Sequence, residues 1–87
     1  MKNTVMLILV DHRQEAAPMV QKILTGWGCF IKTRLGIHNG VLESCSPTGL
    51  IFLELVGDEE KHGELARKLN LVKGVKAKLV TMSLDEE

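Results

Sequence analysis

The sequence predicts an α+β fold whose strands and helices follow the order βαββαβ. Two observations predict it: two segments carry apolar residues at helical spacing, and four short segments are either continuously apolar or alternate in polarity as strands do. The clearest evidence is the tail, where residues 64–72 have helical periodicity, residues 75–80 alternate, and Gly74 marks the change. In the ferredoxin-like arrangement of this order, the strands form one antiparallel four-stranded sheet and both helices lie on one face.

The first strand is predicted over residues 5–10, which are short, β-branched and free of polar side chains. A helix is expected from residue 13 to residue 24, with Asp11 or His12 near its N-cap and Gly26 as its stop. Pro18 would be costly inside a helix but is tolerated in its first turn. We therefore expect an irregular start near residues 12–14 and a regular helix beyond Pro18.

The second strand is predicted over residues 29–37, because their polarity alternates. One face of this strand is expected to carry Cys29, Ile31, Thr33 and Leu35, and the other Phe30, Lys32 and Arg34. Turn-forming residues dominate from 38 to 49 and lead to a third, nearly unbroken apolar strand over residues 50–56.

Asp58 is the predicted N-cap of the second helix. Glu59 and Glu60 follow where the helix dipole favours acids, and Arg67 and Lys68 lie toward the end that favours bases. This helix leads through Gly74 into the last strand.

The two unbroken apolar strands are the two that this fold places in the centre of the sheet. Because both helices cover the same face, the second apolar face of these strands needs a partner, and covering about 500 Å² of it would contribute on the order of 10 kcal/mol. We therefore predict a homo-oligomer, either a dimer or a tetramer. Its predicted interface residues are Leu50, Phe52, Glu54, Val56, Val80 and Met82. Glu54 is expected to meet a cation across this interface or to lie at its rim.

Composition narrows the class of protein. Residues 1–87 are expected to form a single domain, with 11 acidic and 11 basic residues. A balanced charge argues against direct binding to nucleic acid, and the short apolar runs argue against a membrane span. We expect a cytoplasmic protein whose two cysteines, Cys29 and Cys45, are reduced and buried or half-buried.

The chain resembles the ACT-like regulatory domains and, more closely, the iron-only hydrogenase system regulators. The residues that carry the resemblance are 10–13 (VDHR), 33–36 (TRLG), 50–55 (LIFLEL) and 73–78 (KGVKAK). The resemblance spans nearly the whole chain. It implies a non-enzymatic, oligomeric sensor or regulator that is connected with hydrogenase systems.

We do not expect this chain to bind ligands in either of two ways that similar proteins use. Many amino-acid-binding ACT domains have an Asp-x-Pro-Gly turn after the first strand, where this chain has Asp11 followed by His-Arg-Gln. The metal-sensing domain of nickel-responsive repressors, which is similar in fold, places a cysteine at the start of the third strand, where this chain has Gly49. Regulation would then act through a protein target or a small-molecule effector.

The candidate ligand-binding residues are Asp11, His12, Arg13 and Arg34. The first three offer an acid, a base that titrates near neutral pH and a cation, and Arg34 could bind an anion. The alternative is that these side chains cap a helix, are solvated, or protect an edge strand.

Metal binding within one subunit is not expected, because no CxxC, HxH or HExxH spacing occurs. The possible ligands are His12, His38, His62, Cys29 and Cys45. A metal site shared between subunits is the alternative function. No set of residues suits a catalytic centre, so we expect neither an enzyme nor a cofactor.

Overall fold

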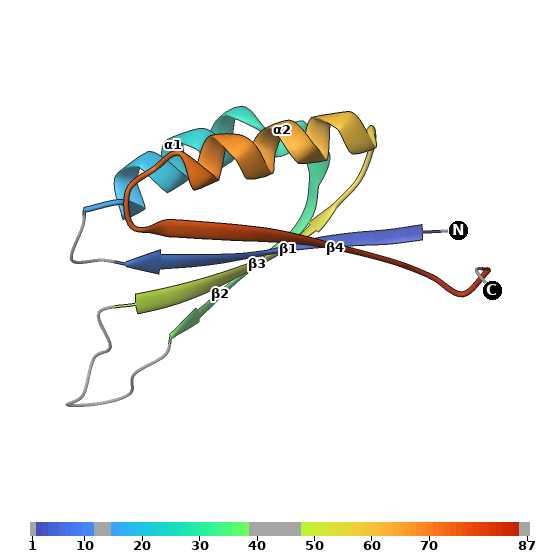
Figure 1. Ribbon diagram of the computed structural model, residues 1–87, viewed down its shortest axis with the longest axis horizontal. Helices are drawn as coiled ribbons and strands as arrows, with labels where there is room; N and C mark the ends of the chain where they lie inside the picture. The colour runs from blue at the N-terminus through green and yellow to red at the C-terminus, as the bar shows by residue number, and fades with distance from the viewer. Residues whose placement is uncertain (1, 12–14, 39–47, 86–87) are drawn as a thin grey trace.

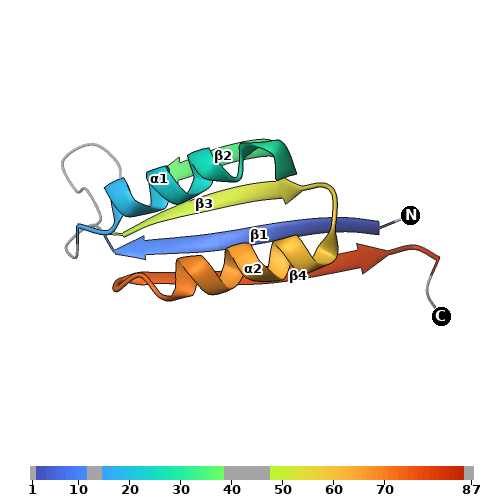
Figure 2. The same cartoon turned by 90° about the horizontal axis from the view of Figure 1, so that it is seen from above.

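The computed structural model describes residues 2–11, 15–38 and 48–85 and has the predicted ferredoxin-like architecture. Its elements are β1 (Lys2–Asp11), α1 (Ala17–Gly26), a short 3₁₀ helix η2 (Gly28–Phe30), β2 (Ile31–His38), β3 (Thr48–Leu55), α2 (Glu59–Asn70) and β4 (Val75–Ser83). The strands form one antiparallel sheet in the order β2-β3-β1-β4, and both helices cover the same face (Figures 1 and 2). The α+β, ACT-like fold class is confirmed.

The core lies between the helices and the two central strands, as the apolar pattern predicts. Met6 and Leu53 pair across β1 and β3, and both are fully buried. Leu65 and Leu69, one turn apart on α2, are also fully buried against this face of the sheet. None of the helices in the described part of the chain is long and apolar enough to cross a membrane.

Helix α1 begins later than predicted. Its N-cap is Ala16, which makes no side-chain cap hydrogen bond, and Pro18 lies in the first turn. Asp11 instead ends β1, where its backbone N–H donates to the carbonyl of Gly74 at 2.7 Å. The predicted cap was wrong because Pro18, which lacks an N–H, is accommodated only within the first turn and therefore sets where the helix starts. His12 and the predicted irregular segment 12–14 lie outside the described residues.

The predicted face assignment of β2 was also wrong. The strand begins at Ile31, because residues 28–30 form η2, and its register with β3 shifts between Ile31 and Thr33. The extra residue at this bulge reverses the alternation, so Ile31 packs toward the helices while Thr33 and Leu35 face the opposite side. Cys29, in η2, is exposed and not buried or half-buried as predicted, and Cys45 lies outside the described residues.

Helix α2 begins as predicted. Asp58 is its N-cap, and the backbone carbonyl of Asp58 accepts hydrogen bonds from the N–H groups of Lys61 and His62. Glu59 follows in the first turn, and its carboxylate accepts a hydrogen bond from Lys2 Nζ at 2.9 Å. This hydrogen bond and the positive charge of Lys2 hold the pKa of Glu59 below its usual value. Gly74, whose φ of 87° is in the left-handed region, turns the chain into β4.

His62 is a buried structural residue and not an exposed ligand. Its side chain is 3% exposed, and its Nε2 donates to the carbonyl oxygen of Val56 at 2.7 Å. The Nδ1 atom is buried and has no hydrogen-bond partner among the described residues. His62 therefore ties the start of α2 to the end of β3.

Replacing His62 by Leu should destabilise the fold by about 0.5–1.5 kcal/mol, because the hydrogen bond from His62 to the carbonyl of Val56 is lost. Chemical denaturation measures this change. Lys61→Ala is the control, since Lys61 is exposed and contributes a surface ion pair with Glu64. Equal midpoints for the His62 variant and the native chain would show that this hydrogen bond contributes nothing.

Candidate functional site

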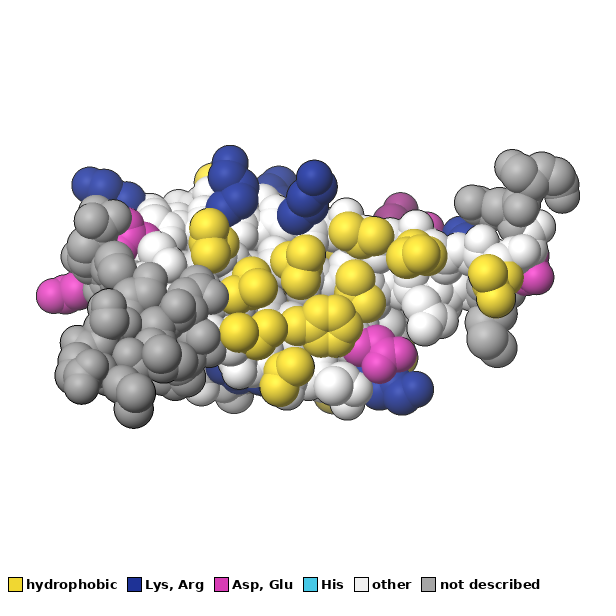
Figure 3. Space-filling view, turned by 90° about the horizontal axis from the view of Figure 1, so that it is seen from below, with side chains coloured by type: hydrophobic (Ala, Val, Ile, Leu, Met, Phe, Trp, Pro, Cys, Tyr) yellow, Lys and Arg dark blue, Asp and Glu magenta, His cyan; other side chains and the backbone are white. Residues whose placement is uncertain are grey.

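The sheet face opposite the helices is apolar and exposed, and we call it the open face. It carries Val5, Leu7, Leu9, Leu35, Ile37, Leu50, Phe52, Val80 and Met82. Several of these side chains are strongly exposed, including Leu9 at 45%, Leu35 at 54% and Met82 at 69%. In the space-filling view the apolar side chains form one continuous patch (Figure 3).

The register explains why this patch is continuous. Leu35 of β2, Phe52 of β3 and Leu7 of β1 lie in one row across three strands. Ile37, Leu50 and Leu9 form the next row. Because apolar side chains occupy both rows, most of the open face is apolar surface, and its removal from water is favourable.

Charged side chains lie at the margins of the open face. Lys76 and Lys78 lie on β4 beside Leu9 and Leu7, and both are exposed. On β3, Glu54 lies where the apolar patch ends, and Thr33 Oγ1 donates to its Oε1 at 3.2 Å. Lys32 Nζ lies 3.9 Å from Glu54 Oε2, so the cation beside this carboxylate belongs to the same chain. Figure 3 shows basic side chains along one margin of the patch and, across the patch, an acidic side chain with a basic one beside it.

Five of the six predicted interface residues, Leu50, Phe52, Glu54, Val80 and Met82, lie on the open face. Val56 follows the end of β3 and is exposed. Sequence reasoning missed Leu35 and Ile37, because the bulge in β2 shifts their alternation. It also left open which alternate set of the first strand joins this face. The pairing of β1 with β3 decides this, since Leu7 lies beside Phe52 and Met6 lies beside the buried Leu53.

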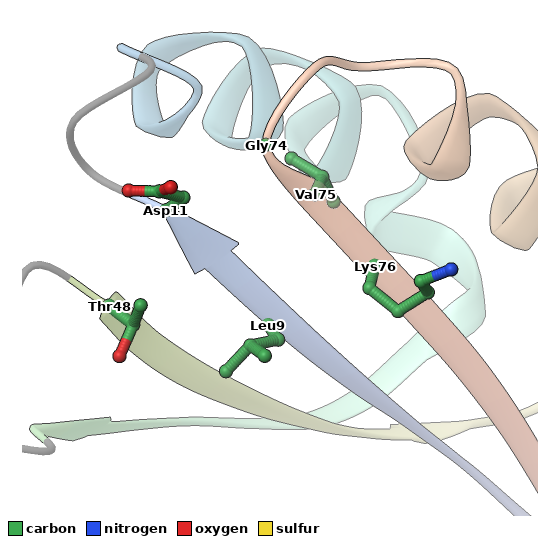
Figure 4. Close-up of a pocket in the computed structure, with 6 residues that line it drawn as sticks. All are labelled: Leu9, Asp11, Thr48, Gly74, Val75 and Lys76. Carbon is green, nitrogen blue, oxygen red and sulfur yellow. The ribbon is translucent and has the colours of Figure 1, made fainter.

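A shallow cavity of about 300 Å³ lies at the end of the sheet where β1 ends and β3 and β4 begin (Figure 4). It is lined by Leu9, Asp11, Thr48, Gly74, Val75 and Lys76. Asp11 lies beside Thr48 in the register, and its N–H bond to Gly74 joins the end of β1 to the start of β4. The lining thus combines the polar side chains of Asp11, Thr48 and Lys76 with the apolar Leu9 and Val75. Leu9 and Lys76 also belong to the open face or its margin, so the cavity continues that face at its polar end.

The structure separates Asp11 from Arg34. Arg34 pairs with Leu53, which pairs with Met6, and Met6 precedes Asp11 by five residues on β1. This corresponds to about 17 Å along the strand direction. The Arg34 guanidinium lies on the helix side, where its Nη2 donates to Gln21 Oε1. Lys76, and not Arg34, is therefore the cation that shares a cavity with Asp11, while His12 and Arg13 lie outside the described residues.

Lys76 and Thr48 could not be found by spacing, because they lie 28 residues apart and far from Asp11 in the sequence. The strand order brings them together, since it places β1 between β3 and β4. Among the residues that the structure describes, no group of three or more His, Cys, Asp or Glu side chains could hold a metal ion. Of the five possible metal ligands, Cys29 and His62 have described side chains, one exposed and one buried.

Several solved structures are similar over nearly the whole chain, and one of them is also similar in sequence. An uncharacterized protein from Thermotoga maritima is 30% identical in sequence, with a TM-score of 0.80, and the match covers 95% of this chain and 100% of that one. The chain belongs to the same family as this Thermotoga protein. No family model matches the chain, and neither does any curated protein.

Two further structures share the fold of this family at low identity. A dimeric ferredoxin-like protein from an uncultured marine organism is 14% identical, with a TM-score of 0.55 and coverage of 99% of this chain and 97% of that one. The ACT domain of GTP pyrophosphokinase from Chlorobium tepidum is 16% identical, with a TM-score of 0.59 and coverage of 100% and 91%. The fold therefore occurs in an ACT domain and in a dimeric protein.

Proposed function

We propose that the chain is a small, non-enzymatic regulatory module that assembles with copies of itself and senses a small-molecule effector or a protein target. The observation that carries this proposal is the open face. It is apolar over three strands, and it lies on the side of the sheet that neither helix covers. The dimeric neighbour and the ACT-domain neighbour support an assembly and a regulatory role.

A second copy suits the open face because the face is apolar. In a twofold assembly each copy contributes the same patch to the interface, so each apolar face covers the other. The charged side chains, Lys76 and Lys78 on β4 and Glu54 with its neighbour Lys32, lie at the margins of the patch. Exposed apolar patches of this kind usually mark interfaces.

The cavity at the polar end of the open face is the proposed effector site. Its size suits a small molecule, and its Asp11 carboxylate and Lys76 ammonium suit a ligand that carries both charges or several hydrogen-bonding groups. Because Leu9 contributes to both the cavity and the open face, a ligand bound there would contact the region where a second copy packs. A ligand that binds the assembled state more tightly shifts the equilibrium toward assembly.

The resemblance to iron-only hydrogenase system regulators supplies the proposed biological context. The target would be a protein of such a system, since the balanced charge of the chain does not favour nucleic acid. Deleting the gene should alter hydrogenase activity in the host, and unchanged activity would remove this part of the proposal.

Light scattering over a range of protein concentrations tests the assembly. We expect a dimer or a tetramer at micromolar concentration, and a stable monomer would contradict the proposal.

Thermal unfolding with a panel of small charged metabolites tests the effector site, since a bound effector raises the unfolding temperature. Lys76→Met should reduce that shift, whereas Lys78→Met, on the same strand but outside the cavity, should leave it unchanged. The alternative function is a metal site shared between subunits. Anaerobic metal titration with elemental analysis tests it, and metal bound in stoichiometric amount would favour this alternative.

A further inference from the structure

The free edge of β4 is protected over only part of its length. At Ala77 the side-chain amide of Asn70 acts as a short substitute strand: Asn70 Nδ2 donates to the Ala77 carbonyl at 3.0 Å, and the Ala77 N–H donates to Asn70 Oδ1 at 2.7 Å. Two residues earlier, the Val75 N–H donates to the carbonyl of Val72 at 3.1 Å. In the first part of this edge, the N–H of Val75 and both backbone groups of Ala77 therefore have partners within the chain.

The second part of the edge presents backbone groups that point outward. In an antiparallel pair, the N–H and C=O groups of alternate residues point toward the neighbouring strand and away from it. The backbone N–H and C=O groups of Ala77 both bind Asn70, so they point away from β1. By alternation along the strand, the N–H and C=O groups of Leu79 and Thr81 also point away from β1. Among the described residues, no hydrogen-bond partner is found for these outward groups of Leu79 and Thr81.

Side chains along the two edges follow the same division. Charged residues and bulges are the usual devices that prevent pairing at an edge. The β2 edge carries Lys32, Arg34 and a bulge, and the first part of β4 carries Lys76 and Lys78. Residues 79–83 of β4 read Leu-Val-Thr-Met-Ser, with no charge, no proline and no glycine. This segment is suited to accept another strand.

We propose that residues 79–83 pair antiparallel with the same segment of a second copy, about a twofold axis near Thr81. A segment that pairs with itself in this way forms a closed, isologous contact, in which each copy satisfies the other's outward groups. The pairing would also bring Val80 and Met82 of both copies side by side, so that two open faces become one wider apolar surface. This edge pairing does not depend on the contact through the open face. A chain that makes both contacts forms a tetramer.

Amide hydrogen exchange of the native, assembled protein tests the proposal. The amides of Leu79 and Thr81 should be protected at high protein concentration and lose that protection on dilution, since their partner is another copy. The Ala77 amide, which binds Asn70, should stay protected throughout and is the internal control. Rapid exchange at Leu79 and Thr81 in the assembled protein would overturn the edge pairing.

Variants separate the edge from the open face. Thr81→Pro removes an outward N–H and should halve the mass measured by light scattering. Thr81→Val keeps the N–H but loses the hydroxyl that lies 3.3 Å from Thr4 Oγ1, so it should keep the native mass. An unchanged mass for Thr81→Pro would refute the edge contact, and an unchanged mass for Phe52→Glu would refute the open-face contact instead. If Thr81→Pro does not fold, the exchange of Leu79 and Thr81 in the native chain decides the question.

Discussion

A chain with Phe52→Glu should lose the contact through the open face and scatter light as a smaller species than the native chain. Phe52 lies in the middle row of this face, between Leu35 and Leu7, so a charge there would be buried in an assembly without a partner. Burying an unpaired carboxylate costs several kcal/mol, and a twofold interface contains the change twice. Each ~1.4 kcal/mol weakens the dissociation constant tenfold.

The matched control is Leu71→Glu. Leu71 is 78% exposed at the end of α2, on the helix side of the sheet, so the same kind of substitution adds a charge far from the open face. Its mass should equal that of the native chain. If both variants dissociate, the open face is not the cause, and if neither does, the open face is not the interface.

Leu53→Ala should destabilise the chain by about 2–5 kcal/mol. Leu53 is fully buried on β3 between the sheet and the helices, where the smaller side chain would leave a cavity. A loss of this size is a large fraction of the stability of a small domain. Denaturant unfolding in the Phe52→Glu background at one fixed protein concentration measures it, because the open-face contact then contributes nothing to stability.

Leu35→Ala in the same background is the control for this prediction. It removes the same atoms from a side chain that is 54% exposed on the open face, so its cost should be below about 1 kcal/mol. Equal costs at the two positions would contradict the division of the sheet into a core face and an open face.

Local patterns were sufficient to predict most of the fold. The unbroken apolar runs identified the two central strands, whose one face meets the helices and whose other face is the open face. The start of α2 at Asp58 and the turn at Gly74 followed from capping and from backbone freedom. The N-cap of α1 was wrongly predicted, since it is Ala16 and not Asp11 or His12, although Pro18 correctly indicated where the regular helix lies.

The candidate site was less accessible from the sequence. The bulge after Ile31 has no strong sequence signal, yet it moves Leu35 and Ile37 onto the open face. Asp11 was identified, but its partner in the cavity is Lys76 and not Arg34, since Arg34 lies on the helix side with Gln21. Such pairings depend on which strands are neighbours and in which register, and spacing along the chain carries no information about either.

The sequence by itself determined the order of the elements, the identity of the central strands and the presence of an apolar face that the helices do not cover. These properties follow from local periodicity and from the number of helices available to cover a sheet. Only the tertiary structure decided which residues share the open face, that Lys76 joins Asp11 at its polar end, and that Asn70 protects β4 at Ala77 but not at Leu79 and Thr81. The physical reason is that strand register and side-chain hydrogen bonds between elements join residues distant in sequence, and both are set when the sheet and helices pack together.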